Sequence, residues 1–182
     1  LVVVEFAVND EGDETQGVSF ESLVMKILQA ENAPAVLLNF AVFMNDWNLQ
    51  NRLQPIGERY ELPMVSVKDA VVPQFEKNRV ITKRQFFYDI YHPTNDGHRI
   101  MADCIANLFE KVDKEEMAEQ DISLDKEPVY GTQFKDLIRF DRTNAEDFAV
   151  IVQNGYDAKD TDIQYVERDM DLNGSPEFAD NW

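Results

Sequence analysis

The chain opens with Leu1-Val2-Val3-Val4-Glu5-Phe6-Ala7, a run in which Glu5 alone is polar. A run without alternation of polar and apolar residues is typical of a strand that is buried on both faces, as in a parallel sheet. After Val8 it ends at a polar corner, Asn9-Asp10. Because this opening resembles the start of an interior strand, we interpret Leu1 as a cut or truncated end rather than a natural N-terminus.

The following segments alternate between helical and strand-like patterns. Apolar residues at three- and four-residue spacing predict helices that begin at Ser19 and Leu49, although Pro55 and Gly57 weaken the second, and a third helix that Asn95 is expected to cap. Two further buried-strand runs lie at 35–43 and 63–67, and the segment 68–75 follows the second of these, which is the third strand of the chain. Alternation with short links predicts βαβ units, hence a three-layer α/β/α sandwich with a parallel sheet.

The composition changes near Val112. Residues 1–112 carry ten basic and sixteen acidic side chains (−6), whereas residues 113–182 carry seven and nineteen (−12). We therefore divide the chain into a domain, 1–112, and an acidic linker with a small β-rich appendage, 113–182, which is either whole or incomplete. Its strand signals are 148–152, an Asn154-Gly155 turn and 163–166.

Charge and cysteine content exclude several classes of function. The formal net charge of −18 repels phosphate backbones and anionic membranes, so nucleic-acid binding is not expected. No apolar run has the length of a membrane span. The single Cys104 excludes an internal disulfide and a cysteine-rich zinc site, and its helical apolar pattern predicts a buried, inert thiol. The compartment, cytoplasmic or secreted, stays open.

Most of the candidate catalytic residues lie in one segment, Asp89-Ile90-Tyr91-His92-Pro93, which Gly97-His98 follows. A turn brings together side chains three residues apart, and a serine esterase needs an imidazole to move protons and a carboxylate to orient it. Asn9, at a strand end, can donate its amide to a developing oxyanion. The alternatives are a surface Asp and His near a helix start, and an ordinary turn-forming Asn.

Together these segments resemble the third and fifth sequence blocks of the SGNH (GDSL) hydrolases, over roughly residues 1–112. The resemblance implies a flavodoxin-like fold, Asn9 in the oxyanion hole, and Asp89 and His92 as two members of the triad. Ala7 departs from the usual Gly. The Gly-Asp-Ser nucleophile block has no counterpart, because none of the five serines has that context: Ser19, Ser22, Ser66, Ser123 and Ser175.

The resemblance implies a serine esterase or lipase-like hydrolase, with the nucleophile upstream of Leu1 in the intact protein and no cofactor or metal. By analogy the substrate is a small-molecule or glycan ester, most naturally an acetyl ester on a carbohydrate. Such a chain alone would be inactive, and a companion N-terminal fragment or a second copy would cover its sheet edge. The alternative is a non-catalytic binding or interaction module that keeps the fold.

Three further features have two interpretations each. Asp169 to Asp180 matches most of an EF-hand-like calcium loop, but an acidic β-turn around Asn173-Gly174 fits better. His98 is expected to belong to the helix entry rather than to a metal site. The group of Phe43, Met44 and Trp47 can line a substrate rim or belong to the core.

Overall fold

The computed structural model describes residues 1–9, 13–78, 80–114, 124–141, 143–150 and 152. The chain divides into two compact units, Leu1–Asp136 and Leu137–Trp182. The predicted division after Val112 stays a prediction, to which the structure adds that part of the following chain packs with the first unit.

The first unit is built on a three-stranded parallel sheet in the order β1-β2-β3. The strands are β1 (Val2–Val4), β2 (Val36–Phe40) and β3 (Met64–Ser66). Val3 pairs with Leu37, and Asn39 pairs with Val65. Every residue of the central strand β2 is buried, as expected for a strand covered on both faces. The predicted α/β fold with a parallel sheet is confirmed.

Helices α1 (Val18–Leu28) and α2 (Gln50–Arg59) cover the sheet through one apolar cluster. Pro55 lies inside α2, so the helix forms despite the predicted weakness. The buried members alternate along β2, recur at helical spacing on α1 and α2, and include Val4 of β1 and residues that follow β1 and α2: Val4, Ala7, Phe20, Val24, Met25, Val36, Leu38, Phe40, Leu53, Ile56, Tyr60 and Leu62.

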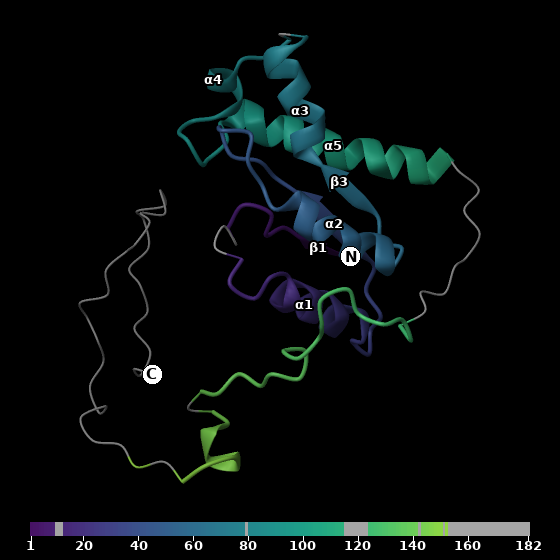
Figure 1. The fold of residues 1–182 in the computed structure, drawn as a ribbon, viewed down its shortest axis with the longest axis vertical. Coiled ribbons are helices and arrows are strands. Elements are labelled where there is room, and N and C mark those ends of the chain that lie inside the picture. Colours follow the sequence, from purple (N-terminus) through teal and green to yellow (C-terminus); the bar gives the residue numbers. More distant parts are fainter. Residues whose placement is uncertain (10–12, 79, 115–123, 142, 151, 153–182) are drawn as a thin grey trace. The chain divides into compact units, whose positions relative to one another are not determined.

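A second cluster involves α3 (Val67–Glu76), α4 (Lys83–Phe86) and α5 (Asn95–Lys114). In Figure 1, α3, α4 and α5 lie on the opposite side of the strands from α1. The buried members are Val42, Val67, Val71, Phe86 and Phe87. The four-residue α4 was not predicted, although its capping box, Thr82 with Gln85, is a readable signal.

The cap of α5 differs from the prediction. Asn95 is the first residue of the helix, and the Thr94 hydroxyl accepts the Gly97 N–H at 3.1 Å. Thr94 therefore satisfies an amide that the helix leaves unpaired. A propensity argument cannot separate Thr94 from Asn95, because both residue types cap helices well.

The segment 124–136 is fastened to α1 by a buried carboxylate. Glu21 is fully buried and accepts the N–H groups of Val129, Tyr130 and Gly131 at 2.7, 2.6 and 2.9 Å, as well as the Tyr60 hydroxyl at 2.8 Å. Four donors replace the water that the carboxylate loses on burial. Burial and the Glu21 contact raise the pKa of Tyr60.

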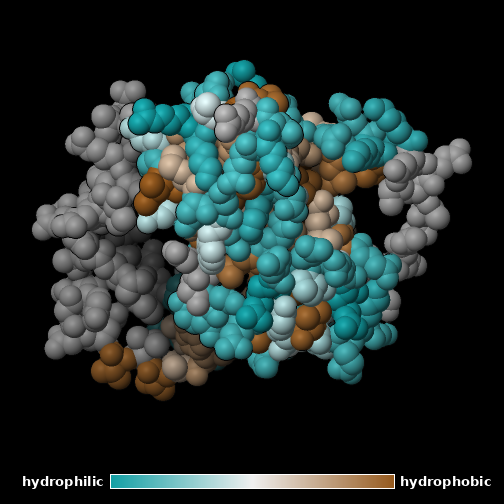
Figure 2. Space-filling view, turned by 45° about the horizontal axis from the view of Figure 1, so that its top comes forward, coloured by the Kyte–Doolittle hydropathy of each residue, from teal (hydrophilic) through white to brown (hydrophobic). Residues whose placement is uncertain are grey.

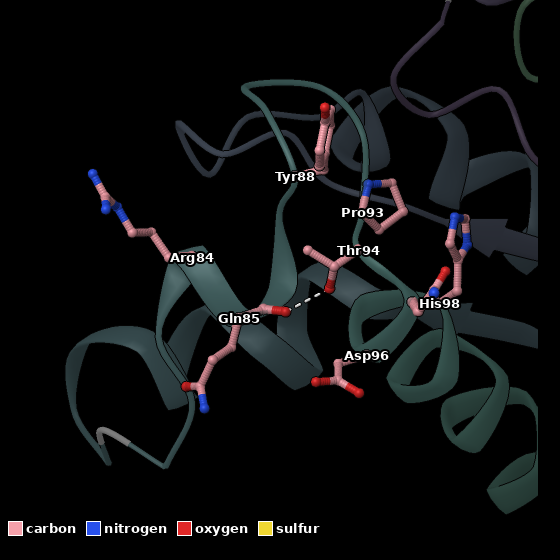
Figure 3. Close-up of a pocket in the computed structure, with 8 residues that line it drawn as sticks. Arg84, Gln85, Tyr88, Pro93, Thr94, Asp96 and His98 are labelled. Atoms are coloured by element: carbon pink, nitrogen blue, oxygen red, sulfur yellow. Dashed lines mark hydrogen bonds between the residues drawn. The ribbon is translucent and has the colours of Figure 1, made fainter.

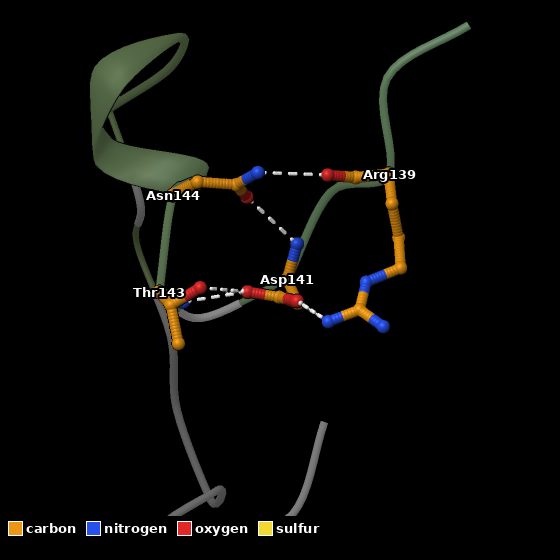
Figure 4. A network of polar contacts seen from close by, with 4 residues as sticks. All are labelled: Arg139, Asp141, Thr143 and Asn144. Atoms are coloured by element: carbon orange, nitrogen blue, oxygen red, sulfur yellow. Dashed lines mark hydrogen bonds and ion pairs between the residues drawn. The ribbon is translucent and has the colours of Figure 1, made fainter. Parts of the chain in front are cut away.

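In the second unit the described residues form a polar turn (Figure 4). Asn144 donates to the Arg139 carbonyl at 2.8 Å and accepts the Asp141 N–H at 2.9 Å, while the Asp141 carboxylate contacts Arg139 and Thr143. The strand predicted over 148–152 is wrong at the residues described: a 3-10 turn, Ala145–Asp147, precedes Phe148, and no strand follows it there. The other predicted strand and its turn lie outside the described residues.

Hydrophilic residues dominate the face of the molecule shown in Figure 2, with apolar side chains in separate patches. This agrees with the excess of acidic side chains. Among the described residues no helix has the length and apolar character needed to cross a membrane.

Candidate functional site

The Asp89–His92 segment is a closed loop between α4 and α5. Phe87 and Pro93 form an isolated antiparallel bridge at its base, and the Tyr88 N–H donates to the His92 carbonyl at 2.8 Å. These contacts hold the two ends of the loop together, so the residues between them project from the body as a tight turn.

Within this loop Asp89 and His92 meet directly. Oδ2 of Asp89 lies 2.9 Å from Nδ1 of His92, and Oδ1 accepts the backbone N–H groups of Tyr91 and His92, both at 2.7 Å. The side chains are 42% and 63% exposed, respectively. One carboxylate therefore orients the imidazole ring and shapes the backbone that carries it.

Asp89 is ionised at neutral pH, and the same contacts keep it ionised to lower pH than an ordinary aspartate. Its hydrogen bonds to the His92 ring and to the His92 and Tyr91 backbone lower the pKa of Asp89 from 3.8 to about 2. An ionised carboxylate against Nδ1 favours a proton on that nitrogen, which leaves proton exchange with a substrate to Nε2. The pair has the geometry of the base and its orienting acid in an acyl-transfer enzyme.

The loop is attached to the carboxyl end of the sheet. The Met44 N–H, beyond the end of β2, donates to the Ile90 carbonyl at 3.2 Å, and the Tyr91 ring packs edge-on against Phe43 with centroids 5.1 Å apart. Phe43 belongs to a buried cluster with Val8 and Ala41. The site residues therefore lie at the edge where α/β folds place their active sites.

Asn9 lies at this same edge. It is exposed and directly follows Val8, which is in the Phe43 cluster, and the neighbouring Ala7 carbonyl accepts the Leu49 N–H at 2.8 Å. Asn9 thus follows Val8 of the Phe43 cluster, and His92 follows Tyr91, whose ring contacts Phe43. The role of Asn9 as an oxyanion donor stays a prediction, and the adjoining Asp10 lies outside the described residues.

Pro93, Gly97 and His98 form the passage from the loop into α5. A Cβ on Gly97 would lie 2.2 Å from the Phe86 carbonyl oxygen and 2.8 Å from Cβ of Pro93, so only glycine fits there. His98 is exposed and lines an open depression of about 590 Å³ with seven other residues (Figure 3). Neither Asp89 nor His92 lines this depression.

The serines that the structure describes have other partners. Ser66 caps α3 by accepting the Asp69 N–H at 3.0 Å, Ser22 donates to the Val18 carbonyl at 2.6 Å, and Ser19 accepts a bond from Thr15 at 2.8 Å. Ser123 and Ser175 lie outside the described residues. In the described part of the chain, Ser19, Ser22 and Ser66 thus each have a hydrogen-bond partner.

Cys104 and groups of metal-ligating side chains are the remaining candidates for chemistry in the part of the chain that the structure describes. Cys104 is half-buried on α5, and burial raises the pKa of its thiol, so it carries less thiolate than an open cysteine. Over the described ranges no three His, Cys, Asp or Glu side chains gather as metal ligands. The calcium-loop candidate, 169–180, lies outside those ranges.

The structure adds two residues that sequence reasoning passed over. Tyr91, read only as a spacer inside the Asp-x-x-His motif, contacts Phe43, and Lys83 bonds the Met44 carbonyl and the Asp46 carboxylate, both at 2.7 Å. Neither role has a sequence signal, because each joins segments that lie far apart in the sequence: Tyr91 is 48 positions from Phe43, and Lys83 is 39 positions from Met44.

The similarity of this chain to known proteins is found among solved structures. No protein-family model and no curated protein matches the chain. The chain is similar to the crystal structure of a two-domain esterase (CEX) active on acetylated mannans, with 32% identity and a TM-score of 0.72 over 79% of this chain and 39% of that one. A structure of such an esterase co-crystallised with mannopentaose matches with 34% identity and a TM-score of 0.60 over 68% and 34%.

The chain is thus related to a carbohydrate esterase, and it spans about two fifths of the length of that protein.

Proposed function

We propose that this chain carries the His–Asp part of an SGNH-type serine esterase that removes acetyl groups from a carbohydrate. The observation that carries the proposal is the 2.9 Å contact between Asp89 Oδ2 and His92 Nδ1 in a loop fastened to the carboxyl end of the parallel sheet. The similarity to an acetylated-mannan esterase supports the substrate class.

In the proposed reaction, Nε2 of His92 takes the proton of a serine hydroxyl as its oxygen attacks the acetyl carbonyl carbon. The carbonyl oxygen becomes an oxyanion, to which the Asn9 amide donates a hydrogen bond. His92 then returns the proton to the sugar oxygen as the ester bond breaks, leaving an acetyl-serine. Water repeats the two steps and releases acetate.

The serine itself comes from outside these 182 residues in this proposal. Ser19, Ser22 and Ser66 serve α1, the 124–136 segment and the cap of α3, and no serine of the sequence has a Gly-Asp-Ser context. A preceding segment of the same protein, or a companion chain, would carry the nucleophile to the sheet edge.

The test uses the protein encoded by the complete reading frame, acetylated mannan as substrate, and a fluorophosphonate probe that labels activated serines. We expect acetate release and one labelled serine. The His92→Ala variant should lower acetate release by at least ~10³-fold and abolish labelling.

His98→Ala is the matched control, since His98 is the other histidine of the chain and lies on the first turn of α5. It should keep both readouts. A wild-type protein that neither reacts with the probe nor releases acetate would contradict the proposal and favour the non-catalytic binding module.

A further inference from the structure

Three aromatic side chains form a group beside the Asp89–His92 pair. Phe43 and Trp47 stack with ring centroids 5.8 Å apart and an interplanar angle of 20°, and Tyr91 meets Phe43 edge-on at 74°. We call Phe43, Trp47 and Tyr91 the aromatic platform. The platform joins the turn after β2 to the loop that bears His92.

The platform is held rigidly by backbone contacts. The turn 43–47 is closed by hydrogen bonds from the Phe43 N–H to the Trp47 carbonyl at 3.0 Å and from the Asp46 N–H to the Phe43 carbonyl at 2.9 Å. Asp46 adopts a positive φ of 67°, and Lys83 bonds its carboxylate and the Met44 carbonyl. The turn keeps this uncommon conformation because the surrounding bonds enforce it.

Tyr91 is the open member of the platform. Phe43 is buried and Trp47 is half-buried, whereas Tyr91 is 51% exposed. Its backbone N–H is bound by Asp89, and its ring centroid lies 6.3 Å from that of His92. A half-exposed ring is thus held in place directly beside the imidazole.

We propose that Tyr91, supported by Phe43 and Trp47, binds the sugar ring that carries the ester, which rests on the proposed esterase function. One face of a pyranose ring consists largely of C–H groups and can bury its apolar area against an aromatic face. Because the ring is already fixed by Phe43 and the loop, stacking costs little additional ordering. Tyr91 is in this sense a specificity-determining residue.

The experiment compares two esters in the complete protein: an acetylated mannooligosaccharide, which can stack, and 4-nitrophenyl acetate, which has no sugar. We expect Tyr91→Ala to lower kcat/KM for the oligosaccharide about tenfold more than for the small ester, through KM. Tyr91→Phe and Tyr91→Trp keep a flat ring and should preserve the ratio of the two values.

Tyr88→Ala is the matched control. Tyr88 is a tyrosine on the same loop, 82% exposed, and it lines the open depression with Pro93 and His98 (Figure 3). Its removal should leave the ratio unchanged. Equal losses on both esters for Tyr91→Ala, or none, would overturn the stacking role.

Binding of mannopentaose, measured by calorimetry, separates the two proposals because it needs no hydrolysis. Wild-type protein should bind it about tenfold more tightly than Tyr91→Ala does. If neither ester is cleaved but this difference appears, the esterase fails and the sugar site stands. If both esters are cleaved with the same ratio in wild type and Tyr91→Ala, and binding is equal, the esterase stands and the platform fails.

Discussion

The carboxylate of Asp89 holds His92 by both its ring and its backbone. Oδ2 lies 2.9 Å from Nδ1, and Oδ1 accepts the His92 N–H at 2.7 Å. Because the two residues are three apart, one short loop supplies both members of the proposed pair of base and orienting acid. The geometry of the pair therefore depends little on the rest of the domain, whereas its position over the sheet depends on the Met44 and Phe43 contacts.

Replacing Asp89 by Asn should remove the charge that orients the imidazole while preserving shape. We expect Asp89→Asn to lower acetate release by the complete protein about 10²–10⁴-fold, because the wrong tautomer of His92 would be favoured. Asp96→Asn is the control, since Asp96 is an exposed acid on α5 whose ion pair with Arg99 spans 3.9 Å. Equal rates for Asp89→Asn and wild type would remove Asp89 from the site.

The lowered pKa of Asp89 predicts how the loop responds to acid. Its pKa is lowered from 3.8 to about 2, so the ionised form binds the loop amides more strongly than the protonated form does. The stabilisation is fully present above about pH 4 and is lost as pH falls through about 2. Any loss of hydrolysis between pH 8 and 4 should therefore not reflect Asp89.

A carboxyl carbon NMR titration checks this pH dependence. The Asp89 midpoint should lie near 2 in wild type and rise in His92→Ala, because the ring contact is the largest cause of the shift. A wild-type midpoint near 4 would show that the Asp89 contacts do not persist in solution.

Gly97→Ala should disturb the entry to α5. The added Cβ would lie 2.2 Å from the Phe86 carbonyl oxygen, and backbone cannot move aside cheaply. We expect a loss of about 1–3 kcal/mol in the free energy of unfolding, typical of overpacking, measured by urea denaturation. Asn107→Ala, at an exposed position of the same helix, should stay close to wild type. Similar midpoints for both variants would mean that the helix entry is more open.

Glu21→Gln should loosen the 124–136 segment. The variant places an amide NH₂ among donors that now meet carboxylate oxygens, which leaves buried N–H groups without an acceptor. We expect a loss of about 2–3 kcal/mol in unfolding free energy and faster proteolysis between residues 124 and 136. Glu110→Gln, exposed on α5 and 3.5 Å from Lys114, is the control. Unchanged proteolysis would show that apolar contacts alone retain the segment.

Much of the α/β framework was predictable because it is encoded locally. Continuous apolar runs predicted β1, β2 and β3, and apolar residues at three- and four-residue spacing predicted α1 and α5. The cap of α5 was assigned to Asn95 instead of Thr94, because both residue types cap helices well. The short α4 was missed although Thr82 and Gln85 form a capping box. The strand expected over 148–152 failed where it is described, because a β-like run needs a pairing partner that sequence alone does not supply.

By itself, the sequence determined the order of buried strands and helices and the meeting of Asp89 with His92, because these depend on backbone periodicity or on residues three positions apart. The tertiary structure alone decided that Glu21 binds amides more than a hundred residues away and that Phe43 supports Tyr91. Such contacts form only when distant loops are closed by packing of the whole domain, and many sequence partners would satisfy the same local pattern.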